Sequence, residues 1–116
     1  MQCGEVNVVS RNNVREYLCG NRSLARLVSL DNNERVLSID VVAPWNSPVD
    51  QSIRVGDVQL IYRRETINNL EWEFVGYDDG SHRELISIRI FLGDHIEDST
   101  IKELIIKALG TYMKDT

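Results

Sequence analysis

Two runs of alternating apolar and polar residues between positions 70 and 92 dominate the hydrophobic pattern of this chain. In both runs the apolar side chains point to one face of an extended backbone and the polar side chains to the other, which is typical of half-buried antiparallel strands. Asp79 and Gly80 lie between the runs and favour a turn. The pattern predicts a hairpin whose inward residues are Leu70, Trp72 and Phe74 in the first strand and Ile86, Ile88, Ile90 and Leu92 in the second.

Other segments extend this hairpin into a larger sheet. Alternation over residues 34–43 and 58–64 predicts two further strands, with Pro44 ending the first of them. Residues 5–9 form a short extended run. Residues 23–30 fit a helix or a strand, and the Asp-Asn-Asn cluster that follows them favours the strand. We therefore expect an antiparallel meander sheet of about five strands.

Two segments have helical spacing. Between Ser10 and Gly20, apolar residues at i, i+3 and i+4 predict a short N-terminal helix. Thr100 and Glu103 have the spacing of a capping box, which predicts a C-terminal amphipathic helix from Thr100 to about Lys114. The core stripe of this helix is Ile101, Leu104, Ile105, Ala108 and Tyr112, and it is widened by Ile106, Leu109 and Met113.

The register of the sheet follows from its period of two. If Leu60 and Tyr62 share a face with Trp72 and Phe74, the connection between these strands contains three or five residues. A three-residue loop at 79–81 then joins the two strands of the hairpin between residues 70 and 92. This register places Glu71 opposite Arg89, Phe74 opposite Ile86, and a row of Arg63, Glu71, Glu73 and Arg89 on the outer face.

These elements predict an α+β fold in a single domain of residues 1–116, with the C-terminal helix packed on one face of the sheet. The length of 116 residues is typical of one domain. The net charge of −5 argues against nucleic acid and anionic membrane as partners, because the basic residues are scattered and no long apolar run is present. A protein with a basic surface is the expected partner.

The two cysteines bear on the expected compartment. The first residues show no basic segment followed by a long apolar one, so the sequence indicates a cytoplasmic protein. In a reducing compartment Cys3 and Cys19 are expected to be free thiols, although they could pair in an oxidising one.

Few residues suggest chemistry. The segment from Asp94 to Asp98 concentrates possible metal ligands, but adjacent residues rarely converge on one ion, and acidic residues at this point favour a helix N-terminus. Asp78 and Asp79 are better explained as turn residues than as a catalytic pair. Cys19 before Gly20 is better explained by packing than by nucleophilic catalysis. We expect no enzymatic activity, no cofactor and no bound metal.

The sequence favours a small acidic inhibitory module that occludes a cationic protein, similar in size and charge to immunity proteins and phage anti-defence proteins. The alternative is a small-molecule-binding or weakly enzymatic domain with a pocket near Trp72, Tyr62 and Tyr112. A homodimer could form through the wide apolar sector of the C-terminal helix. The expected partner-binding residues are the carboxylates Asp78, Asp79, Asp94, Glu97 and Asp98 and the apolar residues Trp45, Ile106 and Met113.

Overall fold

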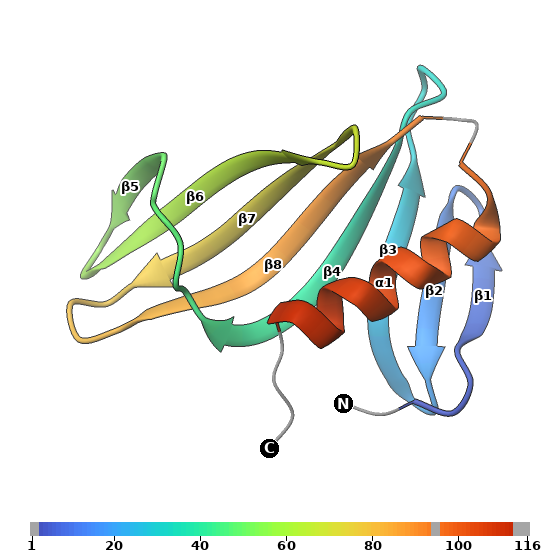
Figure 1. Ribbon diagram of the computed structural model, residues 1–116, viewed down its shortest axis with the longest axis horizontal. Helices are drawn as coiled ribbons and strands as arrows, with labels where there is room; N and C mark the ends of the chain where they lie inside the picture. The colour runs from blue at the N-terminus through green and yellow to red at the C-terminus, as the bar shows by residue number, and fades with distance from the viewer. Residues whose placement is uncertain (1–2, 94–95, 113–116) are drawn as a thin grey trace.

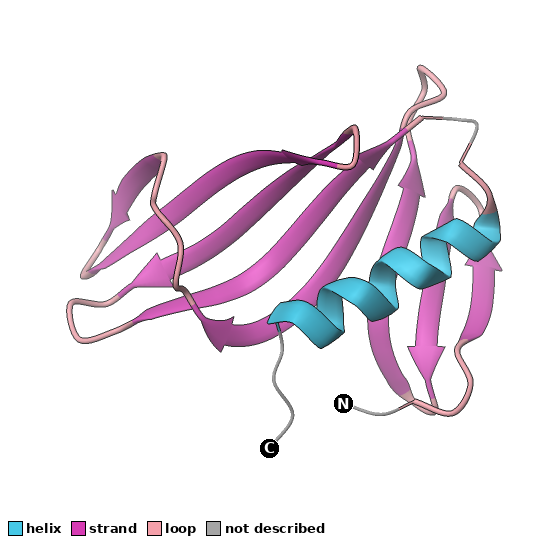
Figure 2. Ribbon diagram, in the orientation of Figure 1, coloured by secondary structure: helices cyan, strands magenta, loops and turns pink. Residues whose placement is uncertain are grey.

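A computed structural model describes residues 3–93 and 96–112 of the chain. These residues form one antiparallel sheet and one helix, an α+β arrangement as expected (Figure 2). The sheet has eight strands rather than about five. The elements are β1 (Asn7–Arg11), β2 (Val14–Cys19), β3 (Arg22–Ser29), β4 (Arg35–Pro44), β5 (Gln51–Val55), β6 (Val58–Ile67), β7 (Leu70–Asp78), β8 (Arg83–Leu92) and α1 (Asp98–Tyr112).

The sheet consists of two four-stranded meanders that meet at its centre. The strand order is β1-β2-β3-β4-β8-β7-β6-β5, so β4 pairs with β8 and the edges are β1 and β5. After β4, residues 45–50 cross in front of β8, β7 and β6 to reach the far edge (Figure 1). This connection is held at both ends, because Trp45 donates its backbone N–H to Arg83 O and Asp50 donates its N–H to Tyr62 O.

The expected N-terminal helix is absent, because its residues belong to the hairpin of β1 and β2. Asn12 and Asn13 connect these strands, and Asn12 adopts a positive φ of 53° that asparagine tolerates. The i, i+3, i+4 spacing that suggested a helix is compatible with a strand in which Arg15 and Tyr17 face one way and Glu16 the other. Pairing with β3, whose strand conformation was predicted, outweighs the weak helical pattern.

The predicted register between β6 and β7 is wrong because their connection has only two residues. Asn68 and Asn69 both have positive φ, as a tight type I′ hairpin turn requires. Phe74 therefore pairs with Arg63, and Trp72 with Glu65. An even loop length reverses the side-chain parity, so Leu60 and Tyr62 point away from Trp72 and Phe74. Arg64 rather than Arg63 lies on the outer face.

Between β7 and β8, the predicted parity is correct but the register is displaced by two residues. Phe74 pairs with Ile88 and Glu73 with Arg89, and a four-residue connection replaces the expected three-residue loop. A bulge on β8 follows the pair formed by Val75 and Ser87. Because of this extra residue, Leu85 is buried in the core and Ile86, which we expected to point inward, is exposed.

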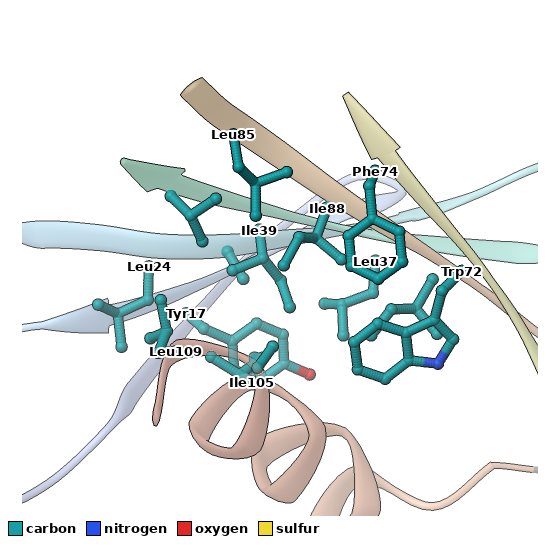
Figure 3. Close-up of a cluster of buried hydrophobic side chains, with 14 of the residues drawn as sticks. Tyr17, Leu24, Leu37, Ile39, Trp72, Phe74, Leu85, Ile88, Ile105 and Leu109 are labelled. Atoms are coloured by element: carbon teal, nitrogen blue, oxygen red, sulfur yellow. The ribbon is translucent and has the colours of Figure 1, made fainter. Parts of the chain in front are cut away.

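The single helix packs on one face of the sheet, called here the helix face. In Figure 1, α1 crosses in front of β2, β3 and β4. The core lies between them, and Trp72 and Phe74 are buried in it as predicted (Figure 3). The helix begins at Asp98, two residues before the predicted cap, because Glu97 O accepts the N–H of Ile101. Its buried residues are Ile101, Ile105, Ala108 and Leu109.

A disulfide joins Cys3 and Cys19, so the prediction of free thiols is wrong. Antiparallel pairing of β1 with β2 places Asn7 opposite Leu18 and brings the preceding residues back toward the end of β2. The two cysteine Cα atoms are 5.9 Å apart, within the usual range for a disulfide. The bond fastens the N-terminal segment to the end of β2, beside the edge strand β1.

Candidate functional site

The face of the sheet opposite α1, called here the outer face, carries a cluster of exposed apolar side chains. A monomeric protein normally buries such residues or uses them in an interface. Ile53 is 68 % exposed and Val42 is 65 % exposed. We call this cluster the outer-face patch, and its members are Val42, Ile53, Val55, Leu60 and Ile86.

The strand register brings the patch together. Ile53 pairs with Leu60, and Leu60 pairs with Tyr77 on the next strand. Val42 lies between the buried residues Val41 and Ala43, so the alternation of β4 turns it to the outer face. The bulge on β8 turns Ile86 to the same side. The patch therefore spans five adjacent strands, with members on β5, β6, β8 and β4 and the half-buried Tyr77 between them on β7.

Several carboxylates border one end of the patch, at the end of the sheet where the β5–β6 and β7–β8 turns lie. Pairing of Gln59 with Asp78 shows that these turns are at the same end. Arg54 and Arg83 are the arginines of this region. The carboxylates outnumber them, and they belong to Asp57, Asp78, Asp79 and Glu84.

Asp78 and Asp79 stabilise the β7–β8 turn, as the sequence indicated. The Asp79 carboxylate accepts hydrogen bonds from the backbone N–H groups of His82 and Ser81 and from the Ser81 hydroxyl. These bonds lower the pKa of Asp79 to about 2. The pKa of Asp78 is lowered by the Gly80 N–H and by Arg83. Both groups therefore keep their negative charge at neutral pH.

A row of charged residues crosses the outer face beside the patch. Glu73 is only 6 % exposed, and its Oε2 lies 2.8 Å from Arg64 Nη2 while its Oε1 lies 3.3 Å from Arg89 Nε. The Tyr62 hydroxyl donates a hydrogen bond of 2.5 Å to Glu73 Oε2. Burial raises the pKa of Glu73, but the bonds from Tyr62 and Arg64 outweigh burial and lower it overall. Two arginines thus share Glu73, and Arg64 Nε also lies 3.0 Å from Glu71 Oε1, so ion pairs link β6, β7 and β8 across the outer face.

The structure does not unite the expected acidic site. Asp78 and Asp79 lie at one end of β8, whereas Glu97 and Asp98 follow its other end, about 30 Å away for a strand of ten residues. Asp98 is also neutralised, because its Oδ1 lies 2.6 Å from Arg15 Nη1. Asp94 lies outside the described residues.

The expected apolar contacts are also dispersed. Trp45 is 7 % exposed and belongs to the core, so it is not presented as an anchor. Ile106 is 59 % exposed on the side of α1 that points away from the sheet. Met113 lies outside the described residues. Of the alternative pocket residues, Trp72 and Tyr112 lie together on the helix face, with ring centroids 6.5 Å apart, whereas Tyr62 is on the outer face.

Sequence reasoning missed the outer-face patch, although one signal for it exists. Gly56 and Asp57 form a two-residue turn in which Gly56 has a positive φ of 62°. Recognising this turn would have paired Ile53 with Leu60 and placed both on one face. The bulge on β8, which exposes Ile86, has no comparable signal in the sequence.

Within residues 3–93 and 96–112, no group of three or more His, Cys, Asp or Glu residues is placed to hold a metal ion. In the same part of the chain no helix has the length and apolar character needed to cross a membrane. No family model matches the chain, and searches of curated proteins and of solved structures find no similar protein.

Proposed function

We propose that this protein is a non-enzymatic binding or inhibitory module that occludes a partner protein through the outer-face patch. The observation that carries the proposal is an apolar cluster across five strands with carboxylates at its end. An interface of this kind has an apolar centre that excludes water and a charged rim that selects the partner. The partner it fits has an apolar contact region bordered by lysine or arginine side chains.

The carboxylates at the end of the patch, called here the rim, favour a cationic partner through long-range attraction. Asp78 is ion-paired with Arg83, whose Nε lies 3.1 Å from its Oδ2, so the uncompensated negative field at this end of the patch comes mainly from Asp79 and Asp57. The overall charge of −5 acts in the same direction. We therefore expect the carboxylates to accelerate association and the apolar patch to slow dissociation.

Affinity capture from the cell of origin tests this proposal. Immobilised wild-type protein is compared with Leu60→Glu, which places a charge in the patch, and with Ile106→Glu, which places the same charge on an exposed isoleucine of α1. We expect a basic protein, identified by mass spectrometry, to be retained by the wild type and by Ile106→Glu but lost with Leu60→Glu. Equal retention by all three would contradict the proposed surface.

Binding kinetics with the captured partner test the role of the rim. Between about 50 and 500 mM salt, the association rate should fall about tenfold while the dissociation rate changes less. Asp57→Asn should slow association at low salt. Asp57 is a better site than Asp79 for this substitution, because the Asp79 carboxylate also holds its turn together. A salt-independent association rate would contradict electrostatic steering.

The outer-face patch replaces the C-terminal helix as the proposed contact for self-association as well. The apolar sector predicted for self-association included Leu109 as well as Ile106, but Leu109 is buried. Ile106 is the only exposed large apolar side chain on the described part of α1. A stable interface buries about 800 Å² on each partner. One exposed isoleucine contributes a small part of that area.

The disulfide also changes the proposed compartment. The expected cytoplasmic location does not fit a bond between Cys3 and Cys19, because cytosolic thiols are kept reduced. We propose that the protein acts in an oxidising compartment. Alkylation of intact cells followed by mass spectrometry should show both cysteines unmodified, and alkylated cysteines would restore the cytoplasmic assignment.

A further inference from the structure

A pocket of about 280 Å³ lies on the helix face, where the end of α1 meets the connection between β4 and β5. Its volume is near the lower limit for small-molecule sites. The pocket is separate from the outer-face patch, and no residue belongs to both. Its apolar lining consists of Pro44, Trp45, Phe74, Leu85 and Tyr112.

The Trp45 ring is held in a fixed position. Its indole Nε1–H donates a hydrogen bond of 2.7 Å to Ser47 O within the same connection. The ring also packs against the backbone of β7 at Gly76, where a Cβ atom would lie 2.8 Å from Trp45 Cε3 and 2.1 Å from Glu84 O. Only glycine leaves room for this packing. Trp45 is thus a rigid aromatic wall that pays little entropy when a ligand binds.

Phe74 and Tyr112 form a second aromatic wall. Their ring centroids are 5.2 Å apart and their planes are inclined by 58°. The polar groups at the pocket are neutral and belong to Asn46, Ser47 and Thr111. Among the described residues that line the pocket none is charged, so nothing there neutralises an ionic ligand. Burying an unpaired charge at this site would be costly.

We propose that this pocket binds a neutral, flat aromatic molecule with one or two hydrogen-bonding groups. The flat part contacts Trp45, Phe74 and Tyr112, and the polar groups reach the side chains of Asn46 or Thr111. Preorganised aromatic walls with a few polar groups are the usual construction of small-molecule sites. The proposal does not depend on the proposed protein-binding function.

Nuclear magnetic resonance with 1-naphthol as the probe tests the proposal. The chain has two tryptophans and therefore two indole N–H signals, which the variant Trp72→Phe assigns. We expect the Trp45 signal to shift and saturate with a dissociation constant on the order of 100 µM. Choline, a cation that aromatic cages also bind, should leave this signal unchanged.

Two matched substitutions on α1 locate the binding site. Thr111→Phe fills the pocket from the helix end and should weaken naphthol binding at least about tenfold. Lys107→Phe adds the same side chain at an exposed position away from the pocket and should change binding by less than about twofold. Leu60→Glu, in the outer-face patch, should have no effect, which separates this test from that of the proposed function.

Three results would overturn the proposal. The first is a Trp45 signal that does not move, or that moves linearly without saturation. The second is unchanged binding by Thr111→Phe. The third is saturable binding of choline in place of 1-naphthol, which would assign the pocket to cations.

Discussion

Ile88 and Val42 lie on adjacent strands of the same sheet, yet Ile88 is fully buried and Val42 is mostly exposed. The difference is the face to which each points. The helix face is closed by α1 (Figure 3) and by the connection through Trp45, whereas the outer face has no second layer among the described residues. A sheet with apolar residues on both faces needs two covers. The described residues supply one of them, so the outer face is where a partner would add most to burial.

The largest expected difference between the two faces is in stability. Trp72→Ala on the helix face should lower the free energy of unfolding by about 3 to 5 kcal/mol, because it leaves a large cavity in the core. Val42→Thr, which keeps the shape of an exposed side chain on the outer face, should change it by less than about 0.5 kcal/mol. Urea denaturation measures both. Similar losses for both variants would mean that the outer face is buried in solution.

Removal of the disulfide should cause the next largest loss of stability. Replacing Cys3 and Cys19 by serine removes a cross-link between residues separated by 16 positions, which should cost about 3 kcal/mol. Denaturation of the wild type with and without a reductant should reproduce this loss. A variant as stable as the oxidised wild type would show that the N-terminal segment needs no covalent attachment.

The charged row on the outer face should contribute less to the free energy of unfolding than Trp72 or the disulfide. Glu73→Gln leaves Arg64 and Arg89 without their shared carboxylate and should cost about 1 to 3 kcal/mol. Glu71→Gln is the matched control, because the Glu71 carboxylate is much more exposed and, among the described residues, forms an ion pair with Arg64 alone. Equal effects of the two substitutions would contradict the central role of Glu73.

Sequence reasoning predicted the parts of the fold that depend on long local patterns. The alternation of β7 and β8 and the amphipathic spacing of α1 identified those elements and the burial of Trp72. It failed where a two-residue turn decided the outcome. Asn68 and Asn69 reversed the parity of β6, and Asn12 and Asn13 joined two strands where a helix was predicted. A change of one residue in loop length inverts a whole face.

The candidate site was harder to predict than the fold, because it depends on distant strands. β4 and β5 lie at the centre and at the edge of the sheet, so Val42 and Ile53 are joined only by the complete strand order. The acidic residues were identified, but their grouping was wrong. Asp98 is held by Arg15 on β2, a contact between residues 83 positions apart that no local pattern reveals.

The β7–β8 turn should contribute a small, pH-dependent part of stability. Asp79 has a folded-state pKa of about 2, below its ordinary value of 3.8, so its contribution is present above about pH 4 and is lost as the pH falls toward 2. Asp79→Asn should flatten the stability curve in this range. Thermal unfolding from pH 2 to pH 6 measures the difference. Parallel curves for the wild type and the variant would contradict the assigned role of Asp79.

The smallest effect is expected for substitution of Ile106 on α1. This substitution gives the most direct comparison between the helix and the outer face. Ile106 is as exposed as the members of the outer-face patch, but on the described part of α1 it has no exposed large apolar neighbour, whereas Leu60 lies beside Ile53 and Tyr77. A single exposed side chain seldom supports an interface. Ile106→Glu should therefore leave stability within about 0.5 kcal/mol and leave the sedimentation coefficient unchanged at tens of micromolar protein.

If the wild type sediments as a dimer, Leu60→Glu should dissociate it and Ile106→Glu should not. Dissociation by Ile106→Glu alone would return the self-association surface to the C-terminal helix.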